Sequence, residues 1–70
     1  MKRNTILKNI GEPNLQLYQG LGYFYFVYDD REEIYDEYCV YVEKLSHLDI
    51  KEWVEEGNTF MKKVKEEHGI

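Results

Sequence analysis

Few side chains in this sequence have the chemistry for catalysis or metal binding: two histidines, one cysteine and a run of carboxylates. His47 precedes a predicted helix and His68 lies near its far end, so about 25 to 30 Å of helix is expected to separate them. Cys39 falls in a predicted strand, with no histidine near it in sequence to lower the pKa of its thiol. We therefore expect solvent-exposed or capping histidines and a passive thiol.

Residues 29–37 hold a dense group of acids: Asp29, Asp30, Glu32, Glu33, Asp36 and Glu37. A calcium loop needs a set alternation of oxygen ligands around a central glycine, and this segment has neither. Paired carboxylates can act as acid and base across a cleft, but 70 residues leave little room for one. We expect no enzyme, metal or cofactor, and we interpret the segment as an exposed loop that is either solvated or used for electrostatic recognition.

Two aromatic and β-branched runs, residues 23–28 and 38–42, flank this loop and are typical of strands. Four apolar side chains are expected to face the core: Phe24, Phe26, Val40 and Val42. The outer face then carries Tyr23, Tyr25 and Tyr41. The opposite assignment buries Tyr23, Tyr25, Val27, Cys39 and Tyr41, which are also fairly apolar. We favour the first because a buried phenylalanine needs no polar partner, whereas a buried tyrosine hydroxyl does.

The rest of the sheet is predicted from alternation and turn residues. Leu15 to Tyr18 alternates apolar and polar residues as a half-buried strand does, and Gly20 and Gly22 suit a tight hairpin turn. The third strand is predicted over residues 38–43. We expect a basic N-terminal arm over residues 1–13, which could be a short strand, a helical turn or disordered, and an antiparallel β-meander over residues 14–45.

The last predicted element is a helix over residues 49–67. Asp49 and Glu52 form a capping box, and Leu48 and Trp53 form a hydrophobic staple. Apolar residues then follow the i, i+3, i+4, i+7 spacing of one helix face. Gly57 interrupts that face at about 1 kcal/mol of helix propensity, which predicts close approach to a tyrosine or a strand. The expected fold is a single small α+β domain, a three-stranded antiparallel sheet packed by one C-terminal amphipathic helix.

Charge is distributed unevenly along the chain, whose formal net charge is -5. Residues 1–28 carry three bases and one acid, a balance of +2, whereas residues 29–70 carry six bases and 13 acids, a balance of -7. An acidic body repels phosphate backbones and attracts basic protein surfaces, so nucleic acid is disfavoured as a partner. No apolar run is long enough for a signal peptide or a membrane helix, so we expect a cytoplasmic protein that does not enter a membrane.

The segment from Leu17 to Phe26, together with residues 40–42, Leu45 and the helix start at Leu48 to Trp53, resembles a family of short uncharacterised proteins encoded on bacterial plasmids and phages. The resemblance covers roughly residues 15–60 and carries no known catalytic residue. It implies a small inhibitor of host defence, similar to anti-CRISPR and anti-restriction proteins, that occupies a basic groove on a nuclease or surveillance complex.

These observations favour a protein-binding module whose partner has a basic surface. The expected contact residues are Tyr23, Tyr25, Tyr41, Asp29, Asp30, Glu32, Glu33, Asp36 and Glu37. Glu52, Glu55 and Glu56 are expected to extend the acidic group into one negative end of the molecule that imitates the phosphates of DNA. Two alternatives stay open: a homodimer joined through its tyrosine faces, and a nucleic-acid binder that uses the basic arm and aromatic sheet. The arm could also simply cover the tyrosines.

Overall fold

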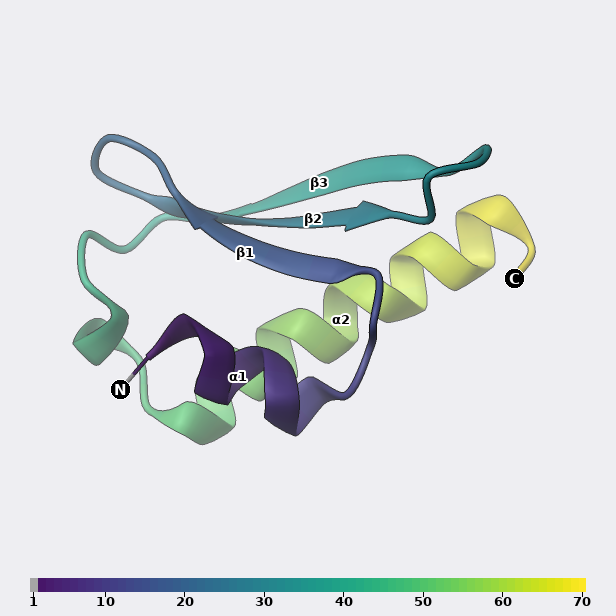
Figure 1. The fold of residues 1–70 in the computed structure, drawn as a ribbon. Helices are drawn as coiled ribbons and strands as arrows, with labels where there is room; N and C mark the ends of the chain where they lie inside the picture. Colours follow the sequence, from purple (N-terminus) through teal and green to yellow (C-terminus); the bar gives the residue numbers. More distant parts are fainter. Residues whose placement is uncertain (1) are drawn as a thin grey trace.

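The computed structural model describes residues 2–70 and shows two layers, a sheet above a pair of helices (Figure 1). The elements follow one another as α1 (Arg3–Ile10), β1 (Leu15–Gln19), β2 (Phe24–Asp29), β3 (Tyr35–Val40), a short 3-10 helix (Leu45–His47) and α2 (Ile50–His68). The three strands form one antiparallel sheet in the order β1-β2-β3. This confirms the predicted α+β class, to which the structure adds α1 and the short 3-10 helix.

The strand register sends the two phenylalanines of β2 into the core, as predicted. Phe24 lies opposite Val40, and Phe26 lies between Leu17 and Tyr38. Alternation places these side chains on the face that packs against the helices. That face supplies most of the buried apolar residues, and β2 is the central strand of the core.

Helix α2 covers this face with the stripe that its sequence spacing predicted. The buried side of the helix carries Trp53, Gly57, Phe60, Met61 and Val64. The Trp53 ring is fully buried and meets Phe24 edge-on, with 5.6 Å between ring centroids. Its Nε1–H donates a hydrogen bond of 2.7 Å to the carbonyl oxygen of Leu45, so the buried indole has a polar partner.

The start of α2 also agrees with the sequence. The Glu52 N–H donates to the Asp49 carboxylate at 2.8 Å, and the Asp49 N–H donates back to the Glu52 carboxylate at 3.2 Å. This is the predicted capping box, which satisfies donors that the first helical turn leaves free. Among residues 2–70, no helix is both long and apolar enough to cross a membrane.

The N-terminal arm is a helix, an outcome that the sequence left open. Ile6 of α1 is fully buried in the core, and α1 lies beside α2 on the same side of the sheet (Figure 1). The arm therefore does not cover the tyrosine face, and that interpretation is wrong. The neighbour closest to Gly57 comes from α1, ahead of the predicted strand: a Cβ there would overlap Ile10 Cδ1 and lie 3.1 Å from Ile10 Cγ1. The close approach is between the two helices, with Phe26 Cζ next, at 3.5 Å.

The third strand begins earlier than predicted and ends earlier. It spans Tyr35–Val40, so three residues assigned to the acidic loop belong to the sheet. Glu37 fits there because β3 is an edge strand whose outer face is open to solvent. Asp36 lies on the other face and reaches His68 at the end of α2. Tyr41 and Val42 follow the strand, and Val42 is half-buried against the core. The loop between β2 and β3 shrinks to residues 30–34.

Candidate functional site: the tyrosine face of the sheet

Four tyrosines form a row across the outer face of the sheet, in the spatial order Tyr18, Tyr25, Tyr23 and Tyr41. Neighbouring ring centroids lie 5.6, 5.8 and 6.2 Å apart along this row. Tyr23 and Tyr25 are half-buried, whereas Tyr41 is 82% exposed. The assignment that would bury these tyrosines in the core is therefore wrong. We call this set the tyrosine row.

Gly20 helps to hold the tyrosine row against the sheet. The ring of Tyr23 lies over Gly20, where an added Cβ would come within 2.6 Å of Tyr23 Cε1. Any side chain at this position would displace the ring. The two glycines of the hairpin thus have separate roles, since Gly22 has a φ of 82° and supplies the left-handed turn.

Beside the row lies a hollow of about 560 Å³, which we call the outer hollow. It is lined by Pro13, Asn14, Gln16, Tyr18, Tyr25, Val27, Asp29, Arg31, Tyr35 and Glu37. Val27 belongs to the outer face, opposite Gln16 and Glu37, yet it is only 6% exposed because its neighbours enclose it. An apolar residue is therefore surrounded by three tyrosine rings and two carboxylates.

Polar contacts orient one wall of the outer hollow. The Tyr35 hydroxyl donates to Glu37 Oε1 at 3.1 Å, and this bond is the main cause that raises the pKa of the Tyr35 phenol. The phenol therefore stays protonated and keeps its donor at neutral pH. The Glu37 carboxylate has lone pairs left over after this single bond, so it can accept from an incoming cation.

The Asp30 carboxylate organises the loop instead of facing the outer hollow. Its Oδ1 accepts hydrogen bonds from the N–H groups of Glu32, Glu33 and Ile34 at 2.9, 3.1 and 3.0 Å. These donors, led by Glu32, lower the pKa of Asp30. Arg31 beside it has a φ of 63°. Asp30 is thus a structural residue of the β2–β3 loop.

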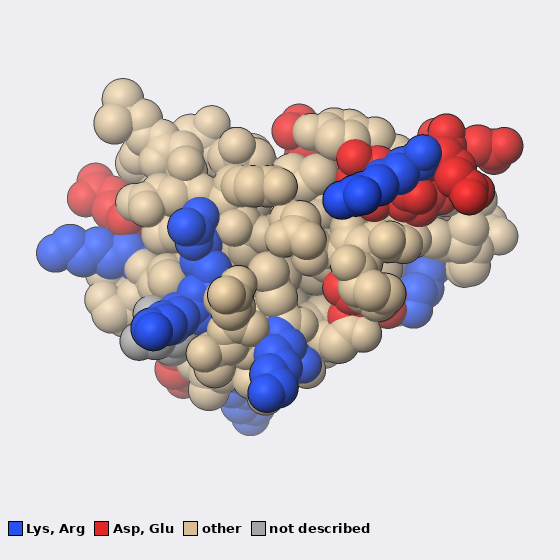
Figure 2. Space-filling view, in the orientation of Figure 1, with Lys and Arg blue, Asp and Glu red and all other residues tan. Residues whose placement is uncertain are grey.

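The six acids predicted as one recognition surface are divided by the fold. Asp29 and Glu37 line the outer hollow, and Glu32 and Glu33 lie exposed at the loop. Asp36 is half-buried, and its Oδ2 lies 3.5 Å from Nε2 of His68 at the end of α2. Figure 2 shows acidic side chains gathered over the end where the β2–β3 loop lies and basic ones over the side of α1.

The acids in the first half of α2 do not extend this negative end, contrary to the prediction. Contact between His68 and Asp36 places the C-terminal end of α2 under the β2–β3 loop. Glu52 therefore lies at the opposite end, across a helix of 19 residues that is about 28 Å long. Glu56 lies between the two ends of the helix and accepts a hydrogen bond of 2.8 Å from the Tyr38 hydroxyl.

The histidines and the cysteine stay apart in the fold. Cys39 is exposed on the outer face, where it raises the pKa of the Tyr41 phenol. His68 instead approaches Asp36 and Glu67, with one potential ligand atom from each residue within 4.8 Å of the others. Groups of this kind are common at protein surfaces without an ion, so this one supports no metal assignment.

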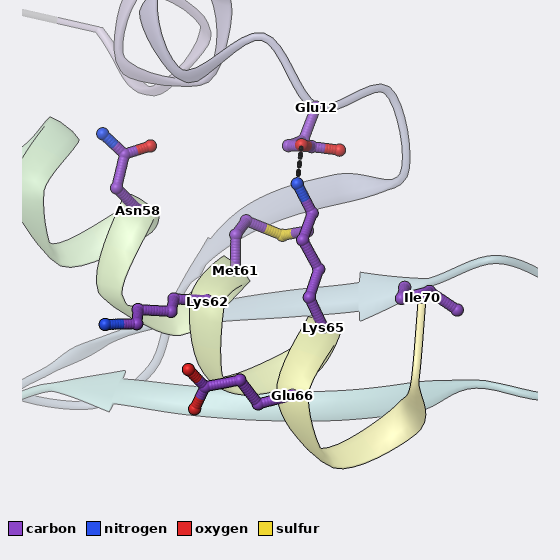
Figure 3. A pocket seen from close by; sticks show the side chains of 7 residues that line it. All are labelled: Glu12, Asn58, Met61, Lys62, Lys65, Glu66 and Ile70. Atoms are coloured by element: carbon purple, nitrogen blue, oxygen red, sulfur yellow. Dashed lines mark hydrogen bonds and ion pairs between the residues drawn. The ribbon is translucent and has the colours of Figure 1, made fainter.

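A second hollow, of about 430 Å³, lies between α2 and the segment that follows α1 (Figure 3). Lys65 points toward Glu12, with 3.4 Å between the charged atoms. Lys62 and Glu66 add one further charge of each sign. Balanced and largely exposed charges select no ligand by sign, so the outer hollow is the better candidate site.

Comparison of the chain with protein-family models, with curated proteins and with solved structures finds no match. The resemblance to short plasmid- and phage-encoded proteins is not tested by these comparisons and stays a prediction. What can be proposed about function therefore rests on the chemistry of the outer face.

Several lining residues of the outer hollow were absent from the predicted contact set, namely Tyr18, Val27, Arg31 and Tyr35. Tyr18 was predicted to lie in the first strand but was not among the expected contacts. Tyr35 was missed because its acidic neighbours were interpreted as loop. The signal that could have identified the longer strand is the spacing, in multiples of two residues, of Ile34, Tyr38, Val40 and Val42, which all pack toward the core.

Proposed function

We propose that this chain is a non-enzymatic protein-binding module whose outer hollow receives an arginine or lysine side chain from a basic protein surface. The main observation behind this proposal is that three tyrosine rings and the carboxylates of Asp29 and Glu37 line the same hollow. Ring faces attract cations by about 0.5 to 2 kcal/mol, depending on how far the cation is desolvated. The carboxylates add charge-assisted hydrogen bonds, which are stronger than neutral ones.

Charge favours a protein over a nucleic acid as the partner. The carboxylates of the outer hollow would lie against any phosphate backbone that stacked its bases on the tyrosine row. The exposed acids at the β2–β3 loop, Glu32 and Glu33, would steer a basic partner toward the same end of the sheet. The tyrosine row would then supply contact area of low entropic cost next to the bound cation.

The resemblance to mobile-element proteins supports a narrower version of this proposal. A basic groove that normally holds nucleic acid, on a defence nuclease or a surveillance complex of the host, has the charge that the outer hollow would bind. The protein would then be an inhibitor that acts in the cytoplasm by occupying the groove.

Co-purification with paired variants tests the proposal. Tagged wild-type protein is incubated with lysate of the cells that produce it, with and without added nuclease. Asp29→Asn combined with Glu37→Gln removes both negative charges from the outer hollow, keeps Arg31 and preserves side-chain size. The control, Glu55→Gln with Glu66→Gln, removes two exposed charges from α2.

We expect a protein that co-purifies with the wild type and with the control, survives nuclease treatment and is lost with the hollow variant. Tyr25→Leu should weaken the same association, because it removes a ring while keeping apolar volume. Equal recovery with all four proteins would contradict a role for the outer hollow. Loss of the protein on nuclease treatment would favour the nucleic-acid alternative.

A further inference from the structure

Strand β1 exposes an edge whose backbone groups can be identified from two hydrogen bonds. The Gly20 N–H donates to the Tyr23 carbonyl at 2.8 Å, and the Asp29 N–H donates to the Asn14 carbonyl at 3.1 Å. In an antiparallel pair, hydrogen-bonded and non-bonded residue pairs alternate. The even-numbered residues of β1 therefore bond to β2, and the odd-numbered ones direct their N–H and C=O groups away from it.

Three residues provide these outward groups: Leu15, Leu17 and Gln19. The Leu15 N–H already donates to the Glu12 carbonyl at 3.2 Å. For Leu17 and Gln19, the part of the chain that the structure describes supplies no bond on the outer side. Their N–H and C=O groups are an open template for another strand.

This edge also lacks the charges that usually protect an edge strand. The sequence has no charged residue between Glu12 and Asp29. The register of β1 with β2 runs without a bulge, and Pro13 precedes the strand instead of interrupting it. The opposite edge differs, because β3 carries Asp36 and Glu37 in its middle. Like charges opposed across a strand pair are destabilising, so β3 is protected from pairing with itself and β1 is not.

We infer that β1 pairs antiparallel with β1 of a second copy of this chain, about a two-fold axis at Leu17. This register makes Leu17 and its symmetry copy a hydrogen-bonded pair, in which each N–H donates to the other carbonyl. Each Gln19 N–H then donates to the Leu15 carbonyl oxygen of the other copy. These bonds need no donor that is already in use within the monomer.

The distribution of charge in the monomer favours a second copy as the occupant. Pairing at β1 puts the two β3 strands at the far edges of a combined sheet, so the acids of the two copies stay as far apart as the sheet allows. The chain is strongly acidic, which makes this separation important.

The combined sheet would have six strands and one outer face. Gln16 of each copy would lie opposite Tyr18 of the other on that face, which joins the two tyrosine rows at the axis. This dimer differs from one made by opposed tyrosine faces, because it leaves the outer face of the sheet exposed. The β1 wall of each outer hollow would lie beside the second copy, whereas Asp29 and Glu37 lie on β2 and β3, away from the new strand pair. It is therefore compatible with the proposed function and does not depend on it.

Sedimentation equilibrium under reducing conditions tests the inference, over protein concentrations from about 10 μM to about 1 mM, where a small interface is expected to associate. Gln19→Pro removes one outward N–H and no bond to β2, a change that edge strands tolerate. Gln19→Lys places a charge at the same edge and keeps the backbone intact. Asp36→Asn with Glu37→Gln is the control at the β3 edge. Asp29→Asn with Glu37→Gln serves as the control at the outer hollow.

We expect reversible dimers for the wild type and for both controls, and a dissociation constant raised about tenfold or more by each Gln19 variant. The Leu17 and Gln19 amides should gain protection from hydrogen exchange as protein concentration rises. A wild type that is monomeric at the highest concentration would overturn the inference. So would a dimer that Gln19→Lys leaves intact, whether or not the proline variant folds.

Discussion

The contact between α1 and α2 at Gly57 makes a quantitative prediction about stability. In most exposed helix interiors, Gly→Ala stabilises by about 1 kcal/mol. Here the new Cβ would overlap Ile10 Cδ1 and lie 3.1 Å from Ile10 Cγ1. Overpacking of this kind destabilises by about 1 to 3 kcal/mol. Gly57→Ala is therefore expected to lower the free energy of unfolding by between about 0 and 2 kcal/mol, where propensity alone predicts a gain.

A double-mutant cycle isolates the contact. Ile10→Val deletes the Cδ1 atom that the new Cβ meets, and by itself should destabilise by about 0.5 to 1.5 kcal/mol. In that background, Gly57→Ala should be less destabilising by about 1 kcal/mol or more, which is the coupling between the two positions.

Urea unfolding measures this coupling through the fluorescence of Trp53, the single tryptophan, which is fully buried. An equal m-value in all four proteins would show that only stability has changed. The reasoning is refuted if Gly57→Ala stabilises by about 1 kcal/mol in both backgrounds, because Ile10 would then not lie over Gly57.

Other contacts make further predictions. Tyr38→Phe removes the bond to Glu56 and should destabilise by about 1 kcal/mol in urea unfolding. That bond raises the pKa of Tyr38, so its contribution to the free energy of unfolding is full below the unfolded pKa of about 10 and is lost as pH rises through the folded pKa. Carbon-13 NMR of the tyrosine rings should show that Glu56→Gln lowers this pKa. The pKa of Asp30 is lowered, so its effect on stability has the opposite pH dependence: the stabilisation is present above the unfolded pKa and is lost as pH falls through the folded pKa. An NMR titration of the Ile34 amide, which donates to Asp30, would detect this loss. Asp49→Ala breaks the capping box and should reduce the urea stability by about 1 kcal/mol.

The parts of the fold that were predictable from sequence are those with strong local signals. The start of α2 depends on the N-cap Asp49 and on its capping box with Glu52, which lie within four residues, and both are present. The core faces of β2 followed from alternation and from the cost of burying a tyrosine hydroxyl. Each of these inferences needs only residues close in sequence and the repeat of side chains along a helix or strand.

The missed features depend on tertiary contacts. Helix α1 has eight residues and no side-chain cap, and an isolated helix of that length is marginal in water. Its stability comes from burying Ile6 against residues far along the chain. The start of β3 was missed because its acids suggest a loop, although an edge strand accepts charge on its open face. The outer hollow combines residues of β1, β2 and β3, so only the sheet register reveals it.

The central claim is that the outer hollow binds a cationic side chain, and an NMR titration tests it most directly. Isotope-labelled protein is titrated with a tetra-arginine peptide, with a tetra-glutamate peptide as the control for charge. We predict shifts of the Val27, Asp29 and Glu37 amides with arginine only, weakened by added salt and abolished by Asp29→Asn with Glu37→Gln. Shifts confined to the exposed acids of α2, or unchanged in that variant, would contradict the account.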